Sequence, residues 1–404
     1  MAQPDCEVAG VGEATSIKKN LKAMPAGMKV HVYDLPPRQA SQTHPLLRDA
    51  EAAVIRGERV AEVLMRLKAQ GYAPDLIYAH PGWGEALFIK DVFPETKLIV
   101  YGEFFFDANG RDVGFDPEFP SRPDEALRLR ARNMTHLSSM AAADVITTPT
   151  GWQKQCMPAS LQDRVVQIHD GIDTHRVHPS AKAHISLARD SLTLTPQDEI
   201  ITFVNRNLEP YRGFHIFMRA LPKLLERRPN ARVIMVGGDD VSYGRSLDGQ
   251  TWRQYMLNEV GAQLDMSRVH FVGKVPYSTY LNMLQVSTAH VYLTYPFVLS
   301  WSMLEAMAAG CLVVGSRTAP VTEVIRDGEN GLLVDFFSPE QIVEAVCRVC
   351  EHPDRMAALR QQARKDVQDR FDLRSVCLPQ QIALIERLAG RQPGPIPMIE
   401  HASV

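Results

Sequence analysis

The stretch ITFVNRNLEPYRGFHIFMRALPKLLE, residues 201–226, joins a short apolar β-branched run to an amphipathic helical pattern. The run predicts a buried strand that ends at Asn205, and residues 213–226 predict a helix. A loop with two arginines connects them. A buried strand followed by a helix is the repeating unit of a parallel sheet with helical crossovers.

The same alternation recurs along the whole chain. The strands predicted for the first half are CEVAG, MKVHVY, PDLIYAH, KLIVYGE, DVITT and RVVQI, separated by amphipathic segments such as 46–70 and 124–143. Those predicted for the second half are ITFVNR, RVIMVGG, VHFVG, HVYLTY, CLVVGS and GLLVDF. This order predicts an α/β protein with two Rossmann-like, doubly wound domains that face a cleft.

Turn residues and a proline interrupt this rhythm at HDGIDTHRVHP, residues 169–179. We therefore expect one domain over 1–178 and a second over 179–375. A helix over 376–390 is expected to return to the first domain. The Pro/Gly-rich end, 391–404, is expected to form a disordered tail.

The N-terminal domain departs from the doubly wound pattern at its start. Such a domain opens with an apolar strand and a Gly-rich turn, whereas CEVAGVG resembles the second strand. The first strand of this fold lies between the second and the fourth, so its absence would split the sheet in the middle. A start recorded too late and an unusual domain would both explain the pattern.

Composition excludes several classes of protein. The 404 residues are 45% hydrophobic and 23% charged, which argues against wholesale disorder. The formal net charge is −3, so no global basic field favours nucleic acid. Neither a signal-peptide pattern nor an apolar run of spanning length is present, and six scattered cysteines indicate a reducing compartment. We expect a cytoplasmic protein in which Cys347 and Cys350 pack within a helix.

Arg206 and Arg212 follow the strand of residues 201–205 in the loop NRNLEPYRG. Guanidinium groups at the carboxyl edge of a strand suit a diphosphate, because arginine is always charged and binds phosphate oxygens bidentately. The alternative is structural: one arginine pairs with Glu209 and the other is solvated. Spacing alone does not separate the two interpretations.

A second informative stretch is YPFVLSWSMLEAMAAGCLVVGS, residues 295–316. It predicts a helix that starts near Ser300 and ends at Gly310, and its free N–H groups would form an anion site. Glu305 could accept hydrogen bonds from a ribose diol. It also fits a capping box with Ser302, in which it only satisfies backbone donors.

Taken together, RNLEPYRG, VGGDD, HFVGKVP, SMLEAMAAG and DGENGLLV resemble, in order and spacing, the C-terminal half of the GT-B fold glycosyltransferases of family 4. This is the large retaining group that includes sucrose synthase-like and mannosyltransferase enzymes. HDGID at 169–173 is similar to the family's interdomain segment. The resemblance is strong over about 165–375 and weak over 70–165.

The resemblance implies roles for individual residues. Arg206 and Arg212 match the basic pair that binds the donor diphosphate, and Glu305 matches the glutamate that binds the nucleotide ribose. Gly237 and Gly238 match a glycine turn beside the nucleotide, and Val275 matches a position that contacts the base. Leu299, Ser300 and Trp301 match a loop whose amides face phosphate and sugar.

One position departs from the family pattern. The first glutamate of the paired-glutamate motif should lie eight residues before Glu305, where this chain has Phe297. Phenylalanine cannot accept hydrogen bonds from sugar hydroxyls, which puts the identity of the donor sugar in doubt.

In the first half, His80 and Glu103 each follow a predicted strand. The family often has an active-site histidine at the position of His80. The structural alternative is that His80 packs against Trp83.

The resemblance implies transfer of a sugar from a nucleoside-diphosphate sugar to a glycan or lipid-linked glycan hydroxyl, with retention. The N-terminal domain is expected to bind the acceptor. If the acceptor is lipid-linked, the protein is expected at the inner face of the membrane. No Asp-x-Asp motif is evident, so neither a metal nor another cofactor is expected. A non-catalytic nucleotide-sugar-binding protein and a GT-B fold sugar-nucleotide epimerase are the alternatives.

Overall fold

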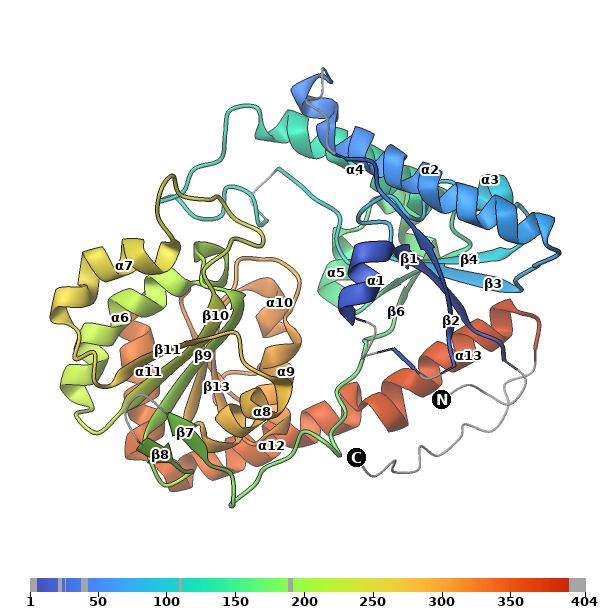
Figure 1. Ribbon diagram of the computed structural model, residues 1–404. Helices are drawn as coiled ribbons and strands as arrows, with labels where there is room; N and C mark the ends of the chain where they lie inside the picture. Colours follow the sequence, from blue (N-terminus) through green and yellow to red (C-terminus); the bar gives the residue numbers. More distant parts are fainter. Residues whose placement is uncertain are drawn as a thin grey trace. The chain divides into compact units, whose positions relative to one another are not determined.

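The computed structural model describes residues 6–20, 24–25, 27–37, 43–108, 111–187 and 192–391 (Figure 1). The chain divides into two compact units. The N-terminal unit contains residues up to 114, then 118–169, and the chain from 378 onward. The C-terminal unit contains residues 115–117 and 170–377.

The C-terminal unit is built on a six-stranded sheet in the order β11-β10-β9-β12-β13-β14. All five neighbouring pairs are parallel, and this is the strand order of a doubly wound domain. The strands are β9 (Ile200–Asn207), β10 (Arg232–Gly238), β11 (Val269–Gly273), β12 (Ala289–Tyr292), β13 (Leu312–Ser316) and β14 (Leu332–Val334).

Helices cover both faces of this sheet, which is why its strands are nearly continuous apolar runs. α6 packs against α7 and α11, and α9 packs against α8 and α12 (Figure 1). The helices are α6 (Phe214–Arg227), α7 (Trp252–Val260), α8 (Tyr277–Val286), α9 (Trp301–Ala308), α10 (Ala319–Thr322), α11 (Pro339–Glu351) and α12 (Pro353–Phe371).

Two details of this unit differ from the sequence-based expectation. β9 continues to Asn207 instead of ending at Asn205, because its last residues still pair with the end of β10, where the register shifts. The weakly patterned segment after the boundary contains an unexpected antiparallel hairpin, formed by β7 (Ile185–Leu187) and β8 (Leu192–Leu194).

The N-terminal unit has two separate parallel sheets among its described residues. β1 pairs with β2, and a second sheet has the order β3-β4-β5-β6. The sheet is therefore interrupted, as expected: β1 and β2 are not hydrogen-bonded to the strands of the larger sheet. The strands are β1 (Ala9–Glu13), β2 (Lys29–Tyr33), β3 (Leu76–Ala79), β4 (Lys97–Tyr101), β5 (Val145–Thr148) and β6 (Val165–Gln167).

α2 and α4 pack together on the N-terminal unit, and the last helix of the chain also belongs to it. That helix, α13, places Leu384 against Ile99 and Ile168 of the four-stranded sheet and its following loop. The helices are α1 (Ala14–Asn20), α2 (Arg48–Ala69), α3 (Ile89–Val92), α4 (Glu125–Ala142), α5 (Gly151–Cys156) and α13 (Leu378–Leu388).

The C-terminal unit begins at Asp170, nine residues before the start expected at 179. The segment after Asp170 is bonded to the end of α12: the Ile172 amide donates to Phe371 O at 2.8 Å, and Asp173 pairs with Arg374 at 2.8 Å. These long-range contacts assign the turn-rich segment to the C-terminal unit. The expected tail from residue 392 onward lies outside the described residues.

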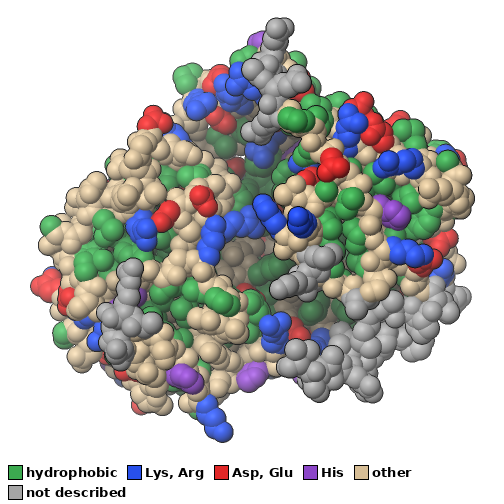
Figure 2. Space-filling view, in the orientation of Figure 1, with side chains coloured by type: hydrophobic (Ala, Val, Ile, Leu, Met, Phe, Trp, Pro, Cys, Tyr) green, Lys and Arg blue, Asp and Glu red, His purple; other side chains and the backbone are tan. Residues whose placement is uncertain are grey.

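The surface charges, the lengths of the apolar helices and the two cysteines of α11 can be compared with the expectations from composition. Acidic and basic side chains are scattered over the face shown in Figure 2, in keeping with the formal net charge of −3. None of the helices that the structure describes is both long and apolar enough to cross a bilayer. Cys347 is buried and Cys350 half-buried on α11, and neither forms a disulfide, so both pack within a helix as expected.

Candidate functional site

Arg212 is a buried guanidinium in the C-terminal unit, with 6% of the residue exposed. It lies in a helical turn after β9, and Gly213 follows with φ +70°, where a Cβ would come within 2.3 Å of Leu293. Arg212 Nη1 donates to Thr294 Oγ1 at 2.7 Å and to Val298 O at 3.0 Å.

Aromatic side chains complete the surroundings of Arg212. Its guanidinium carbon lies 5.4 Å from the ring centre of Tyr243 and 5.6 Å from that of Phe297. Within the described residues it has no carboxylate partner and its Nε and Nη2 groups donate no hydrogen bond. A buried cation surrounded only by neutral groups is incompletely compensated, so this environment favours an anion.

Glu209 does not pair with either arginine. This carboxylate is 1% exposed and accepts the amides of Ser242, Tyr243 and Gly244 at 2.9–3.2 Å. The structural alternative for the loop, an ion pair at Glu209, is therefore wrong. Arg206 lies near the end of β9, is exposed, and has no ion pair in the described part of the chain.

The hydroxyl of Tyr292 connects Arg212 to the start of α9. It accepts the Ser300 amide at 2.8 Å and Arg212 Nη1 at 3.3 Å. Tyr292 is fully buried, and burial raises the pKa of its phenol. The structure therefore brings Arg212 and the loop Leu299–Ser300–Trp301 together, through a tyrosine that the sequence reasoning missed.

The N-terminus of α9 offers fewer free amides than expected. Ser300 is the N-cap residue, as its position predicts, and its side chain accepts the Ser302 amide at 3.3 Å. The Ser300 amide donates to Tyr292, so within the described residues the amides of this loop that make no hydrogen bond are those of Leu299 and Trp301. Leu299 is buried, whereas Trp301 is 56% exposed.

Glu305 projects from α9 toward two tyrosines of α8. Its Oε1 accepts Tyr277 Oη at 2.6 Å, and its Oε2 accepts Tyr280 Oη at 2.7 Å. The predicted capping box with Ser302 is wrong, because Ser300 caps the helix and the carboxylate bonds to side chains of another helix. Tyr277 and Tyr280 were also missed, since nothing in the spacing of α8 relates them to Glu305.

The glycine turn after β10 is closely packed. The Leu208 amide donates to Gly238 O at 2.9 Å, and a Cβ on Gly238 would lie 2.6 Å from Asn207 Oδ1. A Cβ on Gly237 would come within 2.9 Å of Leu208. Val275, after β11, is half-buried against the core of the unit.

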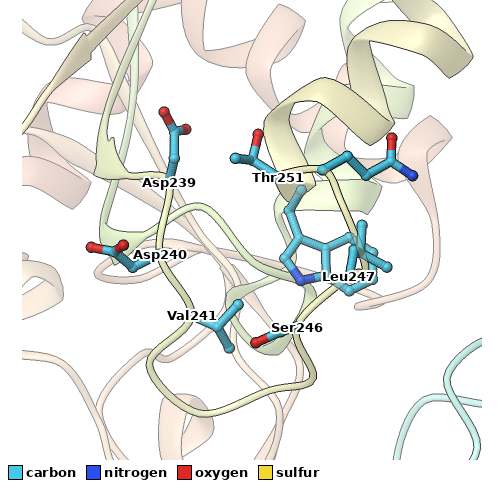
Figure 3. A pocket seen from close by; sticks show the side chains of 8 residues that line it. Asp239, Asp240, Val241, Ser246, Leu247 and Thr251 are labelled. Carbon is cyan, nitrogen blue, oxygen red and sulfur yellow. The ribbon is translucent and has the colours of Figure 1, made fainter.

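A pocket of about 230 Å³ lies in the loop between β10 and α7. Figure 3 shows Asp239, Asp240 and Val241 on one side of this loop, with Ser246, Leu247 and Thr251 on the other. Asp239 pairs with Arg253 at 2.6 Å and Asp240 with Lys274 at 3.3 Å. Two carboxylates make this pocket unsuited to a diphosphate, so we do not place the phosphate site there.

The N-terminal unit brings His80 and Glu103 together. The Gly82 amide donates to His80 Nδ1 at 2.9 Å, and His80 Nε2 lies 3.5 Å from Glu103 Oε2. An accepting Nδ1 places the proton of neutral His80 on Nε2, which faces the carboxylate. His80 also stacks on Trp83, with 4.9 Å between the ring centres. It therefore makes both the packing contact with Trp83 and the contact with Glu103.

These two side chains are more exposed than the groups around Arg212, at 32% for His80 and 46% for Glu103. The backbone of Glu103 is held by fully buried Gln153, whose Nε2 donates to Glu103 O at 2.5 Å. Taken by itself, neither unit holds a cluster of three metal-binding side chains among its described residues.

Two family models match the chain. The model described as "Glycosyl transferase family 4 group" matches residues 9–177, and "Glycosyl transferases group 1" matches residues 186–366. Similar curated proteins are the D-inositol 3-phosphate glycosyltransferases of Corynebacterium glutamicum and a Nocardioides species. The first is 25% identical over 55% of this chain and 52% of its own length, and the second is 30% identical over 58% and 52%. The chain thus spans about half the length of the curated relatives that it matches.

Solved structures show the same fold across both units. The sucrose-phosphate synthase of Thermosynechococcus elongatus has a TM-score of 0.69 at 18% identity, over 95% of this chain and 99% of its own. Anabaena HepE, in complex with UDP and glucose, has a TM-score of 0.63 at 19% identity, over 94% and 91%. The two family models and the two Rossmann-like parallel-sheet units assign the chain to the GT-B fold glycosyltransferases of family 4, group 1.

Proposed function

We propose that this glycosyltransferase moves a sugar from a nucleoside-diphosphate sugar to an acceptor hydroxyl, with retention of anomeric configuration and without a metal ion. The observation that carries the proposal is the buried Arg212 guanidinium, which has neutral partners only and unused donors at Nε and Nη2 among the described residues. A diphosphate supplies the missing negative charge and matches the guanidinium in geometry.

The demanding event is departure of the nucleoside diphosphate. As the bond between the anomeric carbon and the phosphate oxygen breaks, negative charge develops on the phosphate and positive charge on the sugar. Arg206 and Arg212 would stabilise the developing phosphate charge, and preorganised charges of this kind are usually the largest catalytic contribution. The Trp301 amide at the start of α9 adds a donor aligned with the helix dipole.

Retention follows from attack on the face that the leaving group has vacated. The acceptor oxygen would bond to the anomeric carbon within the ion pair, and its proton would pass to the departing phosphate oxygen. His80, with its Nε2 proton directed toward Glu103, is proposed to position the acceptor or the sugar rather than to act as a strong base. Measurement of the anomeric configuration of donor and product by NMR tests retention.

The comparisons support the donor class. HepE, with the same fold, has been solved with UDP-glucose as well as with UDP and glucose. Glu305 supplies a carboxylate for the nucleotide ribose, and the buried arginine supplies a cation for the diphosphate. For the acceptor, we propose a glycan or lipid-linked glycan. The inositol phosphate acceptor implied by the names of the curated relatives is the first alternative to assay.

A binding screen followed by a turnover assay tests this function. UDP, GDP and ADP are added separately, and a nucleotide at 100 times its dissociation constant should stabilise the protein by about 2.7 kcal/mol. The matching nucleotide-sugars are then assayed for nucleotide release, with and without EDTA. Release that survives EDTA supports the proposal, whereas failure of all three nucleotides to bind contradicts it.

A non-catalytic nucleotide-sugar-binding protein is the second candidate, and Phe297 favours it. This residue replaces the motif glutamate, is only 6% exposed, and packs on Tyr211 and Tyr243. A protein of this kind would bind a nucleotide without releasing it from any nucleotide-sugar. The turnover assay separates the two candidates.

A further inference from the structure

Two tyrosine hydroxyls occupy about half of the hydrogen-bond acceptor sites of the Glu305 carboxylate. Tyr277 donates to one oxygen and Tyr280 to the other, at 2.6 and 2.7 Å. A carboxylate has about four lone-pair sites on its two oxygens. The two tyrosine hydroxyls therefore leave about two acceptor sites, which equals the number of hydroxyl donors on a ribose diol.

The two tyrosines are themselves held in place. Tyr280 is 8% exposed and packs in the core of the C-terminal unit. Tyr277 is 40% exposed, and the Arg176 guanidinium carbon lies 4.5 Å from its ring centre. A cation over a phenol ring is attracted to its π face and so restrains the ring.

The protonation state suits hydrogen-bond donation. Burial and then the hydrogen bond to Glu305 raise the pKa of Tyr277, while burial and the charge of Glu305 raise that of Tyr280. Both phenols thus keep their protons at neutral pH and donate them to the carboxylate.

We infer that Tyr277 and Tyr280 are positioning residues of the ribose subsite, which orient Glu305 so that its free lone pairs face the 2′- and 3′-hydroxyls of the nucleotide. The inference rests on the proposed function, since it requires a nucleotide at Glu305. It makes the tyrosine pair a determinant of selectivity for ribose over deoxyribose. A group that orients a binding residue in advance increases selectivity by reducing the ordering required on binding.

The test compares dissociation constants of ribonucleotides and 2′-deoxyribonucleotides by calorimetry. The pairs UDP and 2′-deoxy-UDP, GDP and 2′-deoxy-GDP, and ADP and 2′-deoxy-ADP are titrated into wild type, and the tightest pair is used for the variants. We expect wild type to prefer the ribonucleotide by about tenfold or more, as for a hydrogen bond to a charged group. Tyr277→Phe should reduce that preference about threefold to tenfold.

Two further variants separate orientation from a structural role. Tyr255→Phe is the matched control, because Tyr255 lies half-exposed on α7 against Trp252 and should leave the preference unchanged. In a Glu305→Gln background, Tyr277→Phe should have no additional effect on the preference if it acts through the carboxylate. Equal preference in wild type and Tyr277→Phe would overturn the inference.

Three other outcomes are also decisive. Tighter binding of the ribonucleotide by Tyr277→Phe would show that the tyrosine competes with ribose for Glu305, which also overturns the inference. Failure of every nucleotide to bind wild type would overturn the proposed function together with the inference. A ribonucleotide preference that is lost in Glu305→Gln but kept in both Tyr277→Phe and Tyr280→Phe would leave the proposed function intact and refute only the role of the tyrosines.

Discussion

The two units of this protein hold their candidate functional groups in different ways. In the C-terminal unit, a continuous six-stranded sheet positions Arg212, which is 6% exposed and bonded to groups from β12 and the loop that follows it. In the N-terminal unit the sheet is interrupted, and the His80–Glu103 pair is 3.5 Å apart with 32% and 46% of the side chains exposed.

This difference indicates how much each group is ordered before a ligand arrives. A buried guanidinium with several hydrogen bonds has already lost its conformational freedom, so binding an anion costs little further entropy. His80 and Glu103 are more exposed than Arg212, so their side chains keep more of that freedom. We therefore expect substitutions in the C-terminal unit to affect nucleotide binding or the departure of the nucleoside diphosphate, and substitutions at His80 and Glu103 to affect turnover without changing nucleotide affinity.

The largest expected effect is at Arg206. Arg206→Ala should lower turnover about a thousandfold with an unchanged unfolding midpoint, because the exposed side chain stabilises developing phosphate charge without supporting the fold. Nucleotide-sugar turnover and thermal unfolding are measured together. Arg227→Ala, at another exposed arginine of the same unit, is the control. Near-normal turnover in Arg206→Ala would remove this residue from the site.

His80→Ala should lower turnover about a hundredfold and leave the nucleotide dissociation constant unchanged. Glu103→Gln should have a smaller effect, about tenfold, because we expect Glu103 to act by orienting His80. Steady-state kinetics and nucleotide titration of the same preparations give both quantities. A loss of nucleotide affinity in His80→Ala would contradict the proposed separation between the two units.

Buried histidines make both units sensitive to acid. Burial, with a further contribution from Arg132, lowers the pKa of His136 to about 4, and burial lowers that of His290 to about 3. Both stay neutral in the folded protein, whereas the unfolded chain takes up protons near pH 6.5, so stability is retained above that pH and is lost as the pH falls below it. At pH 5 each histidine should cost about 2 kcal/mol.

Hydrogen exchange from pH 7 to pH 5 resolves this acid sensitivity for each unit. In His290→Gln, the number of protons that the C-terminal unit takes up on unfolding should fall by about one, and that of the N-terminal unit should not change. The exposed His352→Gln serves as the control for the loss of an imidazole. If His290→Gln leaves the pH dependence of that unit unchanged, His290 is not responsible for it.

The smallest expected effect is at Glu209, which holds the loop that carries Tyr243. Glu209→Gln weakens three amide hydrogen bonds to one carboxylate and should reduce the stability of this loop by about 1 kcal/mol. Amide exchange at residues 242–244 should accelerate, while Glu226→Gln at the surface should have no measurable effect there. Unchanged exchange would show that aromatic packing alone holds the loop over Arg212.

Much of the fold could be predicted from the sequence. Most strands of the parallel sheets, the N-cap of α9 at Ser300, and the packing of Cys347 in a helix follow from local apolar periodicity and capping chemistry. The separation of β1 and β2 from the larger sheet of the N-terminal unit was also expected from the sequence. These features depend on residues close together along the chain.

The sequence by itself, through its motifs and the resemblance they carry, determined only which residues are candidates for a nucleotide-sugar site: the two arginines, Glu305, and the pair His80 and Glu103. Only the tertiary structure decided what each one touches. Glu209 could have paired with an arginine and Glu305 could have capped its own helix, since the spacing allows both. In the folded protein Glu209 instead accepts hydrogen bonds from the loop at 242–244, and Glu305 accepts them from Tyr277 and Tyr280. These partners are remote in sequence, and buried polar groups bond to the partners that the fold brings within reach.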